Sequence, residues 1–283
     1  KLGTAYNSID PSPDDVNGHG THIAGIIGSQ NSPYRGVAYG IRGLINAKAG
    51  GDDDGLYGGG ASMADSDAMK CVEWAIIGNP YGAEVLNFSF GGGTAADDTP
   101  LARFWDAVVS QMNVVATIAA GNSGPNPQTL LSPGIAPNVI SVANVQDYGT
   151  LYRVDDSIRN SSSRGPTAGG RKKPDLAAPG TSIISTSSNW EGANADWVGM
   201  SGTSMAAPHV AGAAALLISA GVSDPLAVKA LLINTAEDKG DPGWDSAYGW
   251  GYIDLNNAVF HLEDVYVNSV AETPDVRFYA GPA

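Results

Sequence analysis

The alternation of apolar runs with helical patterns constrains the fold of this chain more than any other feature of its sequence. Apolar runs bounded by Gly or Asn cover residues 44–49, 85–90, 114–120 and 139–142. Helical patterns separate the first three of these runs, at residues 64–77 and 101–112. Strands buried on both faces have such near-continuous apolar sequences, and they belong to parallel sheets covered by helices. We therefore predict an α/β fold with a doubly wound, mostly parallel central sheet and helices on both faces.

Polar and small residues follow two of the predicted strands. Gly91 comes directly after one apolar run, and Gly121 and Asn122 come directly after another. Ligands of doubly wound sheets bind beyond the carboxyl ends of the strands. These residues are therefore expected at the functional edge of the sheet.

A serine and a histidine each stand near the start of a predicted helix of small and apolar residues. Ser204 lies in Gly202–His209, which leads into Val210–Ile218, and His19 lies in Asn17–His22, which leads into Ile23–Ile27. The unpaired N–H groups and positive dipole end of a helix N-terminus stabilise negative charge that develops on an attacked carbonyl. A serine hydroxyl also needs a base to accept its proton. The two segments predict a nucleophile and its base, although Ser204 alone could be an ordinary helix N-cap.

Three segments, 17–27, 118–124 and 201–217, together resemble the subtilisin-like serine proteases, or subtilases. Further segments match the family in the same order, namely 71–76, 87–91, 162–166, 173–180 and 248–254. The resemblance implies that His19 is the general base and Ser204 the nucleophile of a serine endopeptidase. It also implies that the Asn122 amide and the Ser204 backbone N–H bind the oxyanion, whereas Asn122 taken alone could be a turn residue.

The resemblance extends to the strands that bind an extended polypeptide substrate by strand addition. Ser89, Phe90 and Gly91 match the first of these strands, and Gly121 belongs to the same substrate-binding set. A second strand matches at Ala61 and Ser62. Polypeptides are therefore the expected substrates.

The chain departs from the family pattern at the aspartate that orients the histidine. The family carries this residue in an Asp-Thr/Ser-Gly motif before the histidine, and this sequence has no such motif. Asp10, Asp14 and Asp15 match the acidic loop that leads into the histidine segment instead. We expect the aspartate upstream of Lys1, with an upstream segment or propeptide as a partner. The alternative is a protease-like surface or scaffold component with little or no activity.

The resemblance implies that the chemistry requires no cofactor, and structural calcium stays open. Asp52–Asp54 could ligate Ca²⁺, although a solvated acidic loop is the simpler interpretation. His19 and His22 could bind a metal, but the pattern supplies no third ligand. We expect His22 and His209 to be structural, with His209 buried behind the nucleophile.

The composition of the chain excludes some kinds of partner and favours one kind of location. A formal net charge of −14 argues against nucleic acid and anionic membrane surfaces as partners. No apolar run reaches the roughly 18 residues of a transmembrane helix. Cys71 is the single cysteine, so an intrachain disulfide is excluded, and we expect it to be buried. The predicted location is extracellular or at the cell surface.

The alternation of apolar runs with helical patterns ends near the C-terminal end of the given sequence. Residues 1–261 are predicted to form the catalytic domain. Residues 262–283 are predicted to be a linker and the start of a trailing β module, with a strand at 265–270.

Overall fold

The computed structural model describes residues 2–5, 14–15, 17–51, 63–93, 97–188, 197–262, 265–266 and 279–280. The chain divides into two compact units. The first comprises Lys1–Glu84 and Ile184–Gly199, and the second comprises Val85–Ile183 and Met200–Ala283.

The first unit contains the helix that begins at His19, the predicted base. Strands β1 (Leu2–Ala5) and β2 (Ile45–Lys48) pair in parallel, with Leu2 opposite Ile45. The helices are α1 (His19–Gly28) and α2 (Asp65–Glu73). Strands β8 (Ile183–Thr186) and β9 (Trp197–Met200) form a separate two-stranded sheet.

Helix α2 differs from its prediction at its C-terminal end. The expected apolar face of Ala68, Cys71, Val72 and Ala75 is buried, as predicted. The last turn, Trp74–Gly78, is a π-helix rather than a continued α-helix. Asn79 explains this turn, because its backbone N–H donates to Trp74 O at 3.0 Å and its side-chain amide donates to Trp74 O and Ala75 O. The wider turn thus keeps its last carbonyl groups bonded.

The second unit is built on the central sheet. Strands β3 (Val85–Phe88), β4 (Val115–Ala119), β5 (Ile140–Gln146) and β7 (Leu176–Pro179) lie in that order and pair in parallel. Strand β6 (Ser157–Ile158) pairs antiparallel with the end of β5. The mostly parallel sheet predicted from the apolar runs is confirmed for the runs at 85–90, 114–120 and 139–142, whereas the run at 44–49 forms β2, which pairs with β1 in the first unit.

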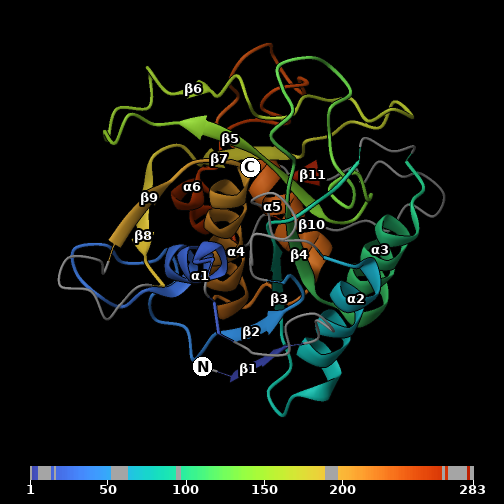
Figure 1. Cartoon of the computed structure of the whole chain (residues 1–283). Helices are drawn as coiled ribbons and strands as arrows, with labels where there is room; N and C mark the ends of the chain where they lie inside the picture. The colour runs from blue at the N-terminus through green and yellow to red at the C-terminus, as the bar shows by residue number, and fades with distance from the viewer. Residues whose placement is uncertain are drawn as a thin grey trace. The chain divides into compact units, whose positions relative to one another are not determined.

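Helices cover both faces of this sheet. Phe88 of β3 packs on Trp105 of α3 (Pro100–Met112), with ring centroids 5.1 Å apart. Because side chains alternate along a strand, Val85 and Asn87 point to the opposite face, where α4 (Thr203–Ser219) packs against β3, β4, β5 and β7. Figure 1 shows α3 and α4 on either side of β3 and β4. The buried residues of α4 are small or apolar, including Ala206, Val210, Ala213 and Leu217.

The remaining described elements of the second unit follow α4. They are α5 (Pro225–Asn234), α6 (Leu255–Phe260), β10 (Val265–Tyr266) and β11 (Tyr279–Ala280), and β10 pairs antiparallel with β11. The strand predicted at 265–270 is thus described over its first two residues. Within the described ranges, no helix combines the length and apolar character needed to span a bilayer.

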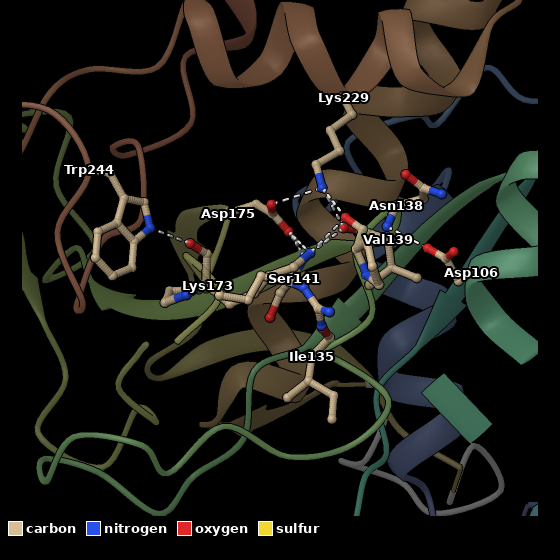
Figure 2. A network of polar contacts seen from close by, with 12 residues as sticks. Asp106, Ile135, Asn138, Val139, Ser141, Lys173, Asp175, Lys229 and Trp244 are labelled. Atoms are coloured by element: carbon tan, nitrogen blue, oxygen red, sulfur yellow. Dashed lines mark hydrogen bonds and ion pairs between the residues drawn. The ribbon is translucent and has the colours of Figure 1, made fainter. Parts of the chain in front are cut away.

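A buried cluster of charges fixes the segment that enters β5 (Figure 2). The ammonium groups of Lys173 and Lys229 both donate to the backbone carbonyls of Pro137 and Val139. Asp175 lies between them, with its oxygens 2.6 Å from Lys173 Nζ and 2.9 Å from Lys229 Nζ. Its Oδ2 also accepts the N–H of Ser141 at 2.7 Å. One carboxylate and two carbonyls therefore share two buried ammonium groups.

This arrangement makes the protonated form of Lys173 costly. Burial lowers the pKa of Lys173 to about 7; Asp175 opposes this shift and the neighbouring ammonium of Lys229 adds to it. The unfolded chain keeps the ordinary lysine pKa of 10.5. Between pH 7 and 10.5 the unfolded state therefore binds more protons than the folded state, and stability rises with pH.

We expect the free energy of unfolding to increase by on the order of a few kcal/mol as the pH rises from 7 to 10. Denaturant unfolding across this range measures the slope. Lys173→Met should flatten it, because Lys229 still pairs with Asp175 and the titrating group is gone. A flat profile in the parent chain, or an unchanged slope in the variant, contradicts the assignment.

Candidate active site

The predicted nucleophile lies at the N-terminus of α4. Ser204 is the second residue of this helix and is half-buried. Its Oγ donates to the backbone carbonyl of Ser89 at 3.2 Å, just beyond the carboxyl end of β3. In return, Ser89 Oγ donates to the backbone carbonyl of Ser204 at 2.8 Å. The structure thus brings Ser204 together with the first predicted substrate-binding segment.

Asn122 lies beside the start of the same helix with a fixed orientation. Its Oδ1 accepts the backbone N–H of Thr203 at 3.0 Å and the hydroxyl of Thr203 at 3.1 Å. Because the amide oxygen has two donors, the Nδ2 amide group is directed away from Thr203. Asn122 as a whole residue is exposed.

Gly202 leaves open the space near the two predicted oxyanion donors. A Cβ at this position would lie 3.4 Å from Asn122 Nδ2 and 3.7 Å from the backbone nitrogen of Ser204. The backbone angles of Gly202, φ 155° and ψ 168°, also belong to a region that is essentially restricted to glycine. The backbone conformation therefore requires glycine before this helix, whereas a Cβ would meet only ordinary van der Waals contacts there.

Thr203 is a residue of the candidate site that the sequence did not single out. Its hydroxyl donates to Asn122 and accepts the backbone N–H of Gly121 at 3.1 Å, and the side chain is fully buried. A helix-start threonine next to the nucleophile was the only signal in the sequence, and it does not identify a partner 82 residues away. Thr203 holds the predicted oxyanion segment against α4.

The predicted substrate-binding residues are only partly described. Strand β3 ends at Phe88, two residues before the end of the predicted strand, so Ser89 and Phe90 follow it outside the regular ladder. Phe90 and Gly91 are half-buried, and the next residue, Gly92, donates its N–H to Ser132 O at 3.1 Å. Ala61 and Ser62 lie outside the described residues.

The predicted base belongs to the first unit. His19 is the first residue of α1 and is half-buried. Asp15 stabilises this helix start, since its carboxylate accepts the N–H groups of Gly18 at 2.8 Å and Thr21 at 2.6 Å. Burial lowers the pKa of His19 from its ordinary 6.5, against the raising effect of Asp15; His22 lowers it further. A lowered pKa keeps the imidazole neutral, the form that accepts a proton.

The other two histidines of interest differ in burial. His22 is fully buried with Nε2 3.0 Å from Val198 O, so the predicted structural role is confirmed. His209 bonds through Nδ1 to Met205 O at 2.8 Å, but it is only half-buried, and the expectation of full burial was wrong. Its ring bonds back along its own helix and stays partly at the surface.

The structure describes only some of the candidate metal ligands. Among the residues that the structure describes, no three His, Cys, Asp or Glu side chains form a group able to share a metal ion. Asp52–Asp54 lie outside the described residues, so the calcium hypothesis stays a prediction. Cys71 is buried, as expected.

Comparisons with known proteins show the family of this chain. The model of the subtilase family matches residues 3–251. Serine protease AprX of Bacillus subtilis (strain 168) is 36% identical over 87% of this chain, which spans 59% of AprX. Fervidolysin of Fervidobacterium pennivorans is 32% identical over 85% of this chain, which spans 34% of that relative.

Solved structures show the same fold. The crystal structure of fervidolysin, described as a keratinolytic enzyme related to subtilisin, has a TM-score of 0.72 with 28% identity and covers 92% of this chain and 39% of its own. A serine-to-alanine mutant of the protease domain of PatA has a TM-score of 0.72 with 26% identity, covering 92% of this chain and 87% of its own. This chain belongs to the subtilase family.

The contacts of Thr203 predict a specific loss of stability. Thr203→Val keeps the shape of the side chain but leaves the buried N–H of Gly121 without its acceptor. The free energy of unfolding should fall by about 1–3 kcal/mol, as is typical of an unsatisfied buried donor. Thr203→Ser retains the hydroxyl and should lose less. Denaturant unfolding compares the two, and equal losses would contradict a role for the hydroxyl.

The surroundings of His19 predict its titration. Its midpoint, followed by NMR of the imidazole ring, should lie below the ordinary histidine value of 6.5. Asp15→Asn should lower it further, because the substitution removes the carboxylate that raises this pKa while keeping one acceptor for the helix. Asp14→Asn is the matched control, with the same charge change one residue away. A midpoint that moves equally in both variants would contradict the assignment to Asp15.

Proposed function

We propose that this chain is the catalytic domain of a serine endopeptidase that forms an acyl-enzyme on Ser204. The observation that carries the proposal is the orientation of Asn122. Two donors from Thr203 hold its amide oxygen, so that Nδ2 is directed away from Thr203. Nδ2 and the backbone nitrogen of Ser204 lie 3.4 Å and 3.7 Å from the place that a Cβ on Gly202 would take. An amide donor and a helix N-terminus in this arrangement are suited to binding the oxyanion of a tetrahedral intermediate.

The proposed mechanism assigns one role to each residue. His19 accepts the proton of Ser204 Oγ as the oxygen attacks the carbonyl carbon of the scissile peptide. Asn122 Nδ2 and the backbone N–H of Ser204 donate to the carbonyl oxygen as it becomes negatively charged. His19 then gives the proton to the leaving amine, and water hydrolyses the acyl-enzyme by the reverse sequence of steps.

Polypeptides are the proposed substrates, bound along Ser89, Phe90 and Gly91 by strand addition. AprX is named a serine protease, which supports this substrate class. We propose an extracellular or cell-surface location on the strength of the acidic composition. The chemistry as proposed uses side chains and backbone groups alone, and calcium at Asp52–Asp54 would be structural.

A fluorophosphonate probe tests the nucleophile, because it reacts with an activated serine. The intact protein that carries this chain should be labelled on Ser204, and Ser204→Ala should abolish labelling. His19→Ala should slow labelling by several orders of magnitude, by analogy with the loss of a triad member. Ser201→Ala is the matched control, since it removes an exposed serine three residues away and should leave labelling intact. A folded but unlabelled protein would favour the protease-like scaffold.

A further inference from the structure

Three polar side chains outside the proposed catalytic set form a continuous line to the nucleophile. Thr117 of β4 donates its hydroxyl to Asn87 Oδ1 at 3.1 Å. Asn87 of β3 donates its Nδ2 to Ser89 Oγ at 2.9 Å. Ser89 Oγ donates to the backbone carbonyl of Ser204 at 2.8 Å. The line therefore runs from the middle of the central sheet to the first turn of α4.

The direction of every hydrogen bond in this line is fixed. The carbonyl oxygen of Asn87 can only accept, so Thr117 must donate to it, and the amide nitrogen can only donate, so Ser89 Oγ must accept. Since Ser89 Oγ already accepts from Asn87, its single proton is available for Ser204 O. Hydrogen bonds aligned head to tail in this way polarise and strengthen one another.

These polar groups lie in a part of the fold that is otherwise apolar, so each of them needs a hydrogen-bond partner. Thr117 is fully buried in an otherwise apolar strand, and Ser89 is 9% exposed. Both Thr117 and Asn87 point to the face of the sheet that α4 covers, which is otherwise filled by residues such as Val115 and Val210. Polar groups in such a layer destabilise the fold unless they are bonded. Each of these groups is bonded, and the bonds connect the sheet to the first turn of α4.

The distances at Ser204 indicate the role of these bonds. Ser89 contacts Ser204 twice, with the 2.8 Å bond to its carbonyl and the 3.2 Å bond from its Oγ. Hydroxyl donors usually lie about 2.5–3.0 Å from an oxygen acceptor. The backbone of Ser204 is thus held firmly, whereas its hydroxyl is held loosely enough to leave for a base.

We propose that Thr117 and Asn87 are positioning residues for the nucleophile, acting through Ser89 to fix the backbone of Ser204 and the resting place of its hydroxyl. The inference rests on the proposed function of Ser204 and extends it to two residues that touch no substrate. A poorly oriented nucleophile reacts slowly even when the ligand binds normally, because small misplacements of reacting atoms cost up to about 100-fold in rate.

The test separates binding from reaction with a fluorophosphonate probe. Thr117→Val is nearly isosteric and removes the hydroxyl, which donates to Asn87 Oδ1 at 3.1 Å and also lies 3.4 Å from Leu86 O. We expect its maximal inactivation rate to fall about tenfold, with the half-saturating probe concentration unchanged. Thr117→Ser restores the hydroxyl and should recover most of the rate, which a purely structural role would not require.

A second variant reverses the direction of the hydrogen bond between residue 87 and Ser89. Asn87→Asp keeps the shape of the side chain, but its carboxylate cannot donate to Ser89, so Ser89 donates to the carboxylate and Ser204 O loses its donor. We expect the same loss of rate without a change in probe affinity. Thr235→Val is the control, since it removes a buried hydroxyl that bonds to Leu231 O, away from this line. It should lower the melting temperature and leave the rate unchanged.

The outcomes distinguish the inference from the proposed function. A parent protein that is not labelled overturns both. A parent labelled on Ser204 whose Thr117→Val and Asn87→Asp variants react within about twofold of its rate overturns the inference alone, because mispositioning should cost more than that. A slow Thr117→Val that Thr117→Ser does not rescue, or a Thr235→Val that reacts equally slowly, also overturns it.

Discussion

The packing of α4 on the central sheet is the constraint on which the second unit depends. The helix is made of small and apolar residues that pack against β3, β4, β5 and β7, so its position is set by apolar burial. Its first turn consequently lies at the carboxyl ends of β3 and β4. Ser204, Thr203, Ser89 and Asn122 meet there because one buried helix begins where two buried strands have just ended.

Polar contacts then orient the side chains that apolar packing has brought together. Thr203 orients the amide of Asn122, and Ser89 bonds twice to Ser204. The entry of β5 is held by the ammonium groups of Lys173 and Lys229 around Asp175. Thr203, Ser89 and the three charged side chains are buried and hydrogen-bonded, because an unpaired polar atom in these layers would cost more than the contact gains. The sheet and its functional edge are therefore stabilised by different kinds of interaction.

Most of the sheet was predictable, and the polar contacts were not. The runs at 85–90, 114–120 and 139–142 became β3, β4 and β5, because burial on both faces leaves a continuous apolar pattern. The end of α2 was predicted as α-helix and is a π-helix, since the deciding contact is the side chain of Asn79 beyond it. His209 was predicted to be buried and is not, because helix periodicity says little about a residue near the rim of the buried face.

The sequence by itself determined the fold class, the family and the identity of the residues that begin α1 and α4. Periodicity records which face of each element is buried, and the motifs record which residue types stand at the strand and helix ends. Only the tertiary structure decided that Thr203 bonds to Gly121 and Asn122, and that Thr117, Asn87 and Ser89 converge on Ser204. These contacts join residues up to 115 positions apart. Their formation depends on strand order and register, for which local sequence carries no periodic signal.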